Sequence, residues 1–428
     1  MNEQKSNKDL LAADQLRADL LRVKAAAPQL ASHSDETISQ ILLDLAEQTL
    51  KFEAEILAAN QLDLARMDKA DPKYDRLLLN HERLAAIAGD LCNVSALVSP
   101  VGQVLEQRTL ESGMDLKKVR VPIGVVAVIF ESRPNVTFDV AALCLKTRNA
   151  CVLKGSSDAH DSNLIIVKLI HSALEKHGLD ASTVFLAPAG RECLPQILQA
   201  VGVIDLAIPR GSRGLIDFVR DHARIPVIET GAGIVHTYVD SSADLKKAKA
   251  IITNAKTRRV SVCNALDTLL VHQDLLGELA EMLRDLGEQF QVEVFADDAS
   301  FAVLDGNYSA ILKQAEEKHF GEEFLAYRMS IKTVSGLDDA LEHIQKYSSK
   351  HSEAIVAENS AVIEQFLNRV DAASVFANAS TAFADGAQFG MGAEIGISTQ
   401  KLHARGPMAL PELTSYKWIV RGDGQIRP

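Results

Sequence analysis

One cysteine in the sequence stands where a thiol could act as a nucleophile. Cys263 lies in NAKTRRVSVCNALDTLLV (residues 254–271), before a run that is typical of a buried strand. The cationic stretch ahead of it contains Lys256, Arg258 and Arg259. Nearby cations favour the reactive thiolate over the thiol, whose free pKa is roughly 8.5, and they also suit an anionic leaving group such as phosphate. On these residues alone, a buried and inert cysteine is the alternative interpretation, because cysteine is often buried.

A carboxylate and two turns could complete such a site. Glu229 ends the predicted strand PVIE and enters a glycine turn, where it could act as a general base or only cap the turn. In PRGSRGLIDFV, Gly211 and Ser212 open a predicted helix whose free N–H groups could hold a pyrophosphate. The alternative is an ordinary glycine-containing turn in which Ser212 caps the helix. Lys154 ends the strand ACVLK and could reach a phosphate or point into solvent. Neither GxxxxGK[ST] nor GxGxxG occurs, so a dinucleotide would bind without the usual fingerprint.

A third group of polar residues is spaced for one face of a helix. His343, Tyr347 and His351 recur every four residues in LEHIQKYSSKHSEAIV, which places them together if the helix extends that far. The glutamate of HExxH is missing, so we expect no metal site here. This face would contact either a substrate or solvent.

The composition excludes several classes of protein. A formal charge of −12 argues against binding to nucleic acid or to an acidic membrane, because both need a basic surface. The longest apolar run, GVVAVIF, is too short to span a bilayer, and the polar N-terminus does not read as a signal peptide. The five cysteines are odd in number and irregularly spaced, so neither a disulfide framework nor a zinc site is indicated. We therefore expect a cytoplasmic protein.

The elements that must position these residues alternate between strands and helices. At 428 residues the chain predicts two or three domains. Residues 34–67 carry a helical period, and predicted strands lie at 125–130, 150–154, 184–187, 205–208, 226–229, 268–271, 292–295 and 330–334. This alternation predicts α/β domains with open, mostly parallel sheets, which bind ligands at the carboxyl ends of their strands.

Four stretches together resemble the gamma-glutamyl phosphate reductase family, a branch of the aldehyde dehydrogenase superfamily. They are VPIGVVAVIFESRPNVTFDVAALCLKTRNA, PVIETGAGIVHTYVD, the segment around Cys263, and EIGISTQKLHARGPMALPELTSYKW. The resemblance covers nearly the whole chain and implies an aldehyde dehydrogenase-like α/β fold. It implies a variant Rossmann cofactor-binding domain at 1–236 with a returning segment near 358–383, an α/β catalytic domain at 237–357, and a small oligomerisation segment at 384–428.

The resemblance also implies roles for individual residues. Cys263 is the nucleophile, Glu229 matches the strand-end glutamate of the superfamily, and Asn135, in ESRPN, matches the amide of the oxyanion hole. The implied cofactor-binding residues are Lys154 and Ser157 near the adenosine ribose, Gly211 and Ser212 at the pyrophosphate, and Glu323 at the nicotinamide ribose. Candidates for binding substrate or phosphate are Arg133, Lys256, Arg258, Arg259, His351 and Arg405.

One position bears on the choice of cofactor. Ser157 stands three residues after Lys154, where NAD-preferring relatives often carry a glutamate that binds both ribose hydroxyls. A neutral serine does not repel a 2′-phosphate, and Lys154 attracts it. We therefore expect NADPH.

The implied function is reduction of L-glutamyl 5-phosphate to L-glutamate 5-semialdehyde and phosphate, through a thioester on Cys263, as the second step of proline biosynthesis. The implied partners are further copies of the chain, in a dimer or tetramer, and a glutamate 5-kinase as candidate donor of the substrate. The alternatives are an oxidising aldehyde dehydrogenase that hydrolyses its thioester and a scaffold with a spent site. ESRPN and KTRRVSVCN weigh against the first, and the retention of Cys263, Asn135 and Glu229 weighs against the second.

Overall fold

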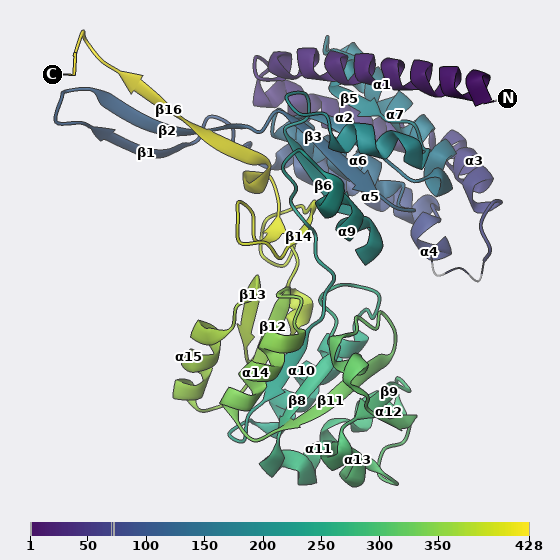
Figure 1. Cartoon of the computed structure of the whole chain (residues 1–428), viewed down its shortest axis with the longest axis vertical. Coiled ribbons are helices and arrows are strands. Elements are labelled where there is room, and N and C mark those ends of the chain that lie inside the picture. Colours follow the sequence, from purple (N-terminus) through teal and green to yellow (C-terminus); the bar gives the residue numbers. More distant parts are fainter. Residues whose placement is uncertain (1, 70, 72, 428) are drawn as a thin grey trace. The chain divides into compact units, whose positions relative to one another are not determined.

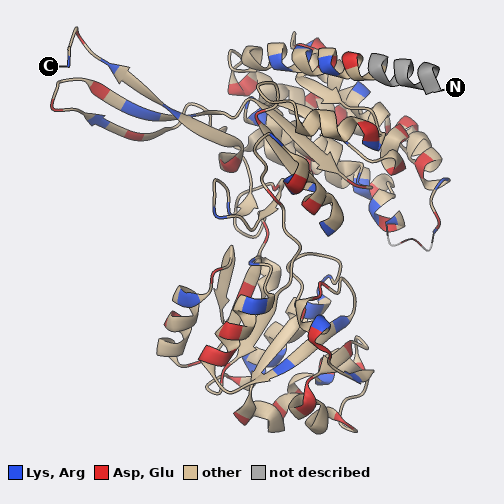
Figure 2. Cartoon of the chain, viewed as in Figure 1, with Lys and Arg blue, Asp and Glu red and all other residues tan. Residues whose placement is uncertain are grey.

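The computed structural model describes residues 2–69, 71 and 73–427, with side chains from Ala12 onward. It divides into two compact units (Figure 1). The first consists of Met1–Thr230, Met391–Gly396 and Met408–Pro428, and the second of Gly231–Gly390 and Ile397–Pro407. Lys and Arg residues are interspersed with Asp and Glu residues on both units (Figure 2). In the described part of the chain, each helix is too short or too polar to cross a membrane.

A four-stranded parallel sheet forms the centre of the first unit. Its order is β5 (Val184–Leu186), β4 (Ala150–Lys154), β3 (Val125–Phe130) and β6 (Leu206–Arg210). Every residue of β3 and β4 is buried, as expected for parallel strands that are covered on both faces. We refer to it as the cofactor sheet, after the role that the family resemblance implies. The helices of this unit are α1 (Asn2–Leu30), α2 (Asp35–Lys51), α3 (Glu53–Leu64), α4 (Tyr74–Leu77), α5 (His81–Ala96), α6 (Asn135–Lys146), α7 (His160–Lys176), α8 (Leu194–Leu198) and α9 (Arg213–His222), with 3₁₀ turns η1 (Ser157–Ala159), η2 (Ala181–Thr183), η3 (Arg191–Cys193) and η7 (Pro411–Leu413).

A second, antiparallel sheet in this unit joins distant parts of the sequence. β1 (Val104–Thr109) pairs with β2 (Asp115–Pro122), and β16 (Thr414–Arg421) pairs with β2 along its whole length. In Figure 1, β1, β2 and β16 lie side by side. Tyr416 and Trp418 on β16 are exposed, and the Lys118 ammonium lies 3.8 Å from the centre of the Tyr416 ring.

The second unit is built on a seven-stranded sheet, which we call the catalytic sheet after the role that the family resemblance implies. All its strand pairs are parallel. The order is β10 (Leu312–Gln314), β9 (Glu293–Ala296), β11 (Arg328–Val334), β8 (Thr268–His272), β7 (His236–Val239), β12 (Ser352–Val356) and β13 (Ser374–Ala377). Its helices are α10 (Leu245–Thr257), α11 (Leu279–Met282), α12 (Arg284–Glu288), α13 (Asp298–Leu304), α14 (Leu337–Tyr347) and α15 (Ser360–Arg369), with 3₁₀ turns η4 (Gln273–Glu278), η5 (Glu317–Gly321) and η6 (Thr381–Phe383).

Alternating residues of the catalytic strands enter two separate hydrophobic cores. Leu269 and Val271 of β8 pack in the core that includes residues of α10, α11 and α13, whereas Leu270 packs with residues of α14 and α15. The period of two along a strand places successive side chains on opposite faces, so both faces of this sheet are covered.

Three boundaries differ from the expectations drawn from the sequence. Residues 231–236 lie in the second unit, and so do residues 358–383, because β13 pairs with β12 and Phe366 of α15 is buried in the core beneath α14. Residues 384–428, including the short strands β14 (Gly396–Ser398) and β15 (Gly406–Met408), are divided between the units. The predicted strand 226–229 is a single bridge between Ala207 and Val227.

Candidate active site

Cys263 lies in the loop between α10 and β8, at the amino end of the catalytic sheet. Gly233 precedes β7 and Glu323 precedes β11, and both of these strands are parallel neighbours of β8. Cys263 is half-buried. The backbone of Gly233 lies directly against it, because a Cβ atom built on Gly233 would fall 1.6 Å from the carbonyl oxygen of Cys263. Only glycine can occupy that position without displacing the cysteine.

Hydrogen bonds hold this loop from two sides. The N–H of Gly233 donates to Oε1 of Glu323 at 2.9 Å. On the other side, the Thr381 hydroxyl donates to the carbonyl oxygen of Asn264 at 2.8 Å, and the Asn264 amide donates to the carbonyl oxygen of Ala384 at 3.2 Å. The backbone that carries Cys263 is therefore fixed by residues distant from it in the sequence.

The three cations ahead of Cys263 do not act as one cluster. Arg258 and Arg259 are exposed just beyond the end of α10. Lys256 is fully buried, its Nζ donates to the carbonyl oxygen of Leu266 at 2.8 Å, and it lies 4.0 Å from Asp267. The assignment of Lys256 to phosphate binding is therefore corrected, because the last turn of α10 directs this side chain into the core.

His351 also needs correction as a substrate ligand. α14 ends at Tyr347, so His351 does not share a helix face with His343 and Tyr347. It is fully buried before β12, where its Nδ1 hydrogen-bonds with the Ser352 hydroxyl at 2.8 Å. Burial lowers the pKa of His351 to about 4, so the imidazole is neutral at physiological pH and offers no cation to a phosphate.

Arg405 takes part in an ion-pair cluster around one carboxylate. The Asp371 carboxylate forms ion pairs with Arg405 at 2.8 Å, Lys401 at 2.9 Å and Lys350 at 3.4 Å. Hydrogen bonds from Lys401 and then Arg405 hold the pKa of Asp371 far below its ordinary value. Three cations share one anion, so the cluster keeps a positive balance.

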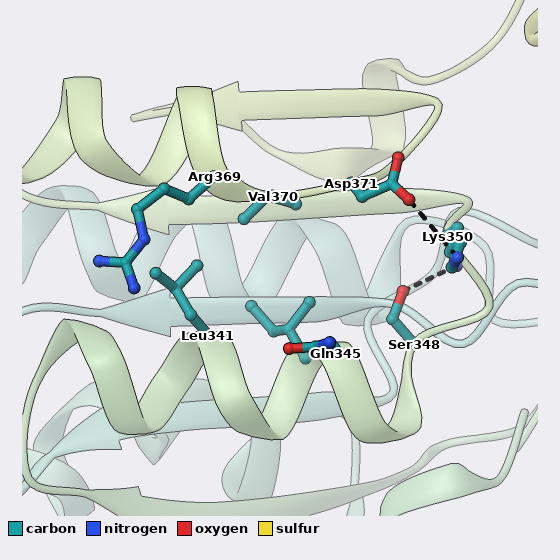
Figure 3. A pocket seen from close by; sticks show the side chains of 8 residues that line it. Leu341, Gln345, Ser348, Lys350, Arg369, Val370 and Asp371 are labelled. Atoms are coloured by element: carbon teal, nitrogen blue, oxygen red, sulfur yellow. Dashed lines mark hydrogen bonds and ion pairs between the residues drawn. The ribbon is translucent and has the colours of Figure 1, made fainter. Parts of the chain in front are cut away.

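A groove of about 430 Å³ borders this cluster (Figure 3). It is lined by Leu341, Ile344, Gln345, Ser348, Lys350, Arg369, Val370 and Asp371. Both of its cations are already paired, Lys350 with Asp371 and Arg369 with Asp338. None of the site residues predicted from the sequence lines this groove, so we do not assign the substrate to it.

The first unit places its predicted residues at the carboxyl ends of the cofactor sheet. Lys154 ends β4 and is buried, with its Nζ donating to the carbonyl oxygens of Gly155 at 2.7 Å and Ala189 at 2.9 Å. Burial lowers the pKa of this lysine below its ordinary value. Ser157 is exposed at the start of η1.

A carboxylate already occupies the N-terminus of α9. The N–H of Ser212 donates to Oε2 of Glu131 at 2.8 Å, and its hydroxyl donates to Oε1 at 3.3 Å. A Cβ atom at Gly211 would meet Oε2 of Glu131 at 2.6 Å. The position therefore accepts anionic oxygen, as a dinucleotide pyrophosphate would require, provided that Glu131 turns away. The residues present fit such a cofactor.

The loop between β3 and α6 carries Arg133 and Asn135. Ser132, with a φ of 41°, is held there because its N–H donates to the Ser156 hydroxyl and its own hydroxyl donates to Asp158. Asn135 is the first residue of α6, and its amide donates to Asp139 at 3.0 Å. Burial raises the pKa of Asp139 to about 7. Arg133 is half-buried.

Glu229 is half-buried at the end of the first unit. The guanidinium of Arg220, on α9, lies 3.7 Å from its carboxylate. Among the described residues, no group of histidine, cysteine and acidic side chains is arranged to hold a metal ion.

The structure adds two residues that the sequence analysis did not single out. Glu131 stands inside the ESRPN motif, and its position at the end of a fully buried strand was the available signal. Asp267 stands at the start of another buried strand, where a carboxylate is costly unless it is paired. Its partners come from other parts of the chain, so spacing alone could not reveal them.

Comparisons with known proteins place the chain in a family. The model of the aldehyde dehydrogenase family matches residues 16–302. The gamma-glutamyl phosphate reductase of Chlorobium chlorochromatii is 60% identical over 416 residues, which cover 97% of this chain and 99% of that protein. The crystal structure of the gamma-glutamyl phosphate reductase of Thermotoga maritima is similar, with a TM-score of 0.92 and 39% identity, covering 96% of this chain and 100% of that chain.

A more distant structure shows how widely the fold is shared. An acetylating aldehyde dehydrogenase from Geobacillus thermoglucosidasius is 19% identical with a TM-score of 0.70, and the match covers 98% of this chain and 99% of that chain. The expected aldehyde dehydrogenase-like α/β fold is thus confirmed. With the family model matching most of the sequence and a close relative matching nearly all of it, the chain belongs to the gamma-glutamyl phosphate reductases, a branch of the aldehyde dehydrogenase family.

Proposed function

We propose that this chain reduces L-glutamyl 5-phosphate to L-glutamate 5-semialdehyde and phosphate with NADPH, through a thioester on Cys263, in proline biosynthesis. One observation carries the proposal. A half-buried cysteine follows two exposed arginines in a chain that is 60% identical to a relative named for reducing gamma-glutamyl phosphate.

The first step is an attack by the Cys263 thiolate on the 5-carbonyl carbon of the acyl phosphate. Charge then develops on the carbonyl oxygen, and hydrogen-bond donors must stabilise it. We assign this task to the backbone N–H of Cys263 and, as the family resemblance implies, to the amide of Asn135. Gly233 and Glu323 keep the Cys263 backbone in place during the attack.

The second step is departure of phosphate as the carbon–oxygen bond breaks and the thioester forms. Arg258 and Arg259 are the exposed cations nearest to Cys263 in the sequence, and guanidinium groups suit phosphate oxygens. We assign them to the leaving phosphate, and Lys256, which is buried, is excluded from this role. Arg405 and Arg133 stay candidates for contact with the substrate.

Lys154, Ser157, Gly211, Ser212 and Glu323 are the proposed cofactor-binding residues. When bound, NADPH supplies the hydride that brings the thioester carbon to the aldehyde level. Water must be kept from the thioester, because hydrolysis would waste the intermediate. In this direction no water has to be activated, so we propose that Glu229 has a lesser role than in hydrolytic relatives.

We further propose that the chain forms a homo-oligomer through the sheet β1–β2–β16. This sheet exposes Tyr416, Trp418 and Val420, which is costly for a surface that stays in water. Sedimentation of the full chain and of a Trp418→Lys variant tests this proposal, because the variant should be smaller. A glutamate 5-kinase is a candidate donor of the substrate.

The decisive experiment is the reverse reaction, reduction of NADP⁺ by L-glutamate 5-semialdehyde, with and without inorganic phosphate. We expect activity that requires phosphate and that falls by ~10⁴-fold or more in Cys263→Ala. Cys92→Ala is the matched control, because Cys92 is exposed on α5 and should not matter. Activity without phosphate would indicate a hydrolysing aldehyde dehydrogenase instead, and no activity with either nicotinamide cofactor would indicate a scaffold.

A further inference from the structure

Two of the buried ionisable groups that the mechanism above does not use lie close to Cys263 in the sequence. Lys256 and Asp267 are both almost completely inaccessible to solvent, and they lie 4.0 Å apart. Removing charges from water is costly, so a buried pair of this kind needs further hydrogen bonds to persist. The Lys256 ammonium has one to the carbonyl oxygen of Leu266, and its charge faces the ring of Phe324 at 6.0 Å.

Asp267 connects the three segments that surround Cys263. Its Oδ1 accepts the N–H of Phe324 at 3.1 Å, and its Oδ2 accepts the N–H of Val235 at 3.4 Å. Its own backbone N–H donates to the carbonyl oxygen of Val235 at 3.0 Å. One carboxylate therefore fixes the starts of β7 and β11 to the start of β8.

This bracing reaches Cys263 through contacts only one or two residues away. Phe324 follows Glu323, whose carboxylate accepts the N–H of Gly233. Gly233 in turn lies against the backbone of Cys263 so closely that no Cβ atom fits between them. A shift of Phe324 or Val235 would move the cysteine with it.

We propose that the Asp267 carboxylate, held ionised by Lys256, is a positioning residue that sets the reactivity of the Cys263 thiol. The proposal deepens the function above and rests on Cys263 being the nucleophile. Neither side chain touches the substrate in this role. Asp267 acts through the two N–H groups that it accepts.

The chemistry of a carboxylate makes this role dependent on pH. Burial raises the pKa of Asp267 and lowers that of Lys256, while the Lys256 charge opposes the first shift and the Glu323 charge adds to it. Lys256 on α10 and Glu323 before β11 are the charged groups that face Asp267 in the described part of the chain. A protonated Asp267 keeps fewer acceptor sites for the two N–H groups, so the loop loosens as the pH falls.

The test is the rate at which iodoacetamide alkylates Cys263, measured without substrate or cofactor by mass spectrometry of the Cys263 peptide. The wild-type rate should be recorded from about pH 5.5 to about 9.5, a span that covers an ordinary thiol. We expect a fall on the acid side that is steeper than titration of one thiol produces. Cys92, which is exposed in the same chain, is the internal control and should follow a single titration.

Three variants separate positioning from simple charge balance. Asp267→Asn should lower the alkylation rate of Cys263 about 10-fold, the effect of losing a hydrogen bond to a charged group. The double variant Lys256→Met with Asp267→Asn removes both charges and should be as resistant to unfolding as the wild type. Its Cys263 should still be alkylated at the lowered rate, and that rate should no longer fall more steeply at low pH than titration of one thiol produces. Asp297→Asn is the matched control, because Asp297 also pairs with a lysine and accepts two backbone N–H groups, but beyond the carboxyl end of β9.

Two outcomes would overturn the proposal. One is a wild-type profile that follows a single thiol titration, which needs no variant to fold. The other is a double variant whose Cys263 reacts at the wild-type rate, which would mean that Lys256 and Asp267 only neutralise each other's charge and do not position Cys263. Because alkylation needs neither substrate nor cofactor, a failure of the phosphate-dependent reaction would reject the proposed function without deciding this question.

Discussion

The two parallel sheets carry the residues of the candidate site at opposite ends. In the cofactor sheet, Glu131, Lys154 and Ser212 lie at or just beyond the carboxyl ends of β3, β4 and β6. In the catalytic sheet, Gly233, Cys263 and Glu323 lie before the amino ends of β7, β8 and β11. Open parallel sheets usually bind ligands at the carboxyl ends of their strands, and the catalytic sheet departs from that rule.

The end of the sheet at which a site lies determines whether backbone N–H groups or side chains supply its positive charge. Beyond the carboxyl end of a parallel strand the chain enters a helix, whose free N–H groups attract anions. Ahead of an amino end the chain leaves a helix, and the C-terminus of that helix repels a thiolate. Cys263 follows the C-terminus of α10, so side chains must supply what the backbone cannot. Arg258, which directly follows α10, and Arg259 are the cations that we propose for this role.

Among the tests of this comparison, the largest effect is expected from Gly233→Ala, which probes the amino end of the catalytic sheet. The added methyl group would fall within bonding distance of the Cys263 carbonyl, so the cysteine must move. We expect kcat to fall by about 100-fold, the usual result of a displacement near 1 Å. Gly277→Ala is the control, because nothing lies within 4 Å of its Cβ position. An unchanged kcat would mean that Cys263 is held by other contacts.

Next in size is the loss of the arginines. Arg258→Ala and Arg259→Ala should each raise the KM for phosphate in the reverse reaction about 10-fold, because each removes a charge-assisted contact. Lys246→Ala removes an exposed cation from the start of the same helix and should leave that KM unchanged. Equal effects of all three variants would indicate a general influence of net charge.

The cofactor sheet is tested by Ser157→Glu. A carboxylate at this exposed position should repel the 2′-phosphate and raise the KM for NADPH at least about 10-fold. The KM for NADH provides the comparison within the same variant, because NADH lacks that phosphate. A lower KM for NADH than for NADPH in the wild type would contradict the NADPH proposal itself.

The smallest effect is expected from Glu131→Gln, measured as the Kd for NADPH by its fluorescence. Neutralising the carboxylate at the N-terminus of α9 removes a competitor for the pyrophosphate, so the Kd should fall about 3-fold. Glu175→Gln makes the same change of charge on the exposed face of α7 and should have no effect. A weaker affinity in Glu131→Gln would show that Glu131 helps to shape the site with the cofactor bound.

Local pattern predicted the strands well where burial is continuous. The runs 125–130 and 150–154 match β3 and β4. Parallel strands that are covered on both faces form nearly continuous apolar runs, which are easy to recognise in a sequence. The predicted strand 226–229 failed because it pairs at one residue only. The returning segment 358–383 was misplaced because pairing between β12 and β13 is decided in space and leaves no mark on composition.

In the candidate site, too, some features follow from the local sequence pattern and others are decided only by tertiary contacts. Lys256 could have been recognised as buried, because it follows Ala248 and Ile252 at intervals of four along α10 and shares their face. The burial of His351 and the bracing by Asp267 depend on strands that meet only after folding. Position in a motif therefore singled out Cys263 and its neighbours as candidates, while the direction of their side chains required the fold.

The pairing of β16 with β2 has a consequence for how the chain is made. β2 leaves the ribosome long before β16, which covers one of its edges. Between them lie the four strands of the cofactor sheet and the almost uninterrupted second unit, which has its own cores and can fold before β16 is made. One edge of β2 therefore stays unpaired until β16 has been synthesised, and its charged side chains oppose pairing with strands of other nascent chains.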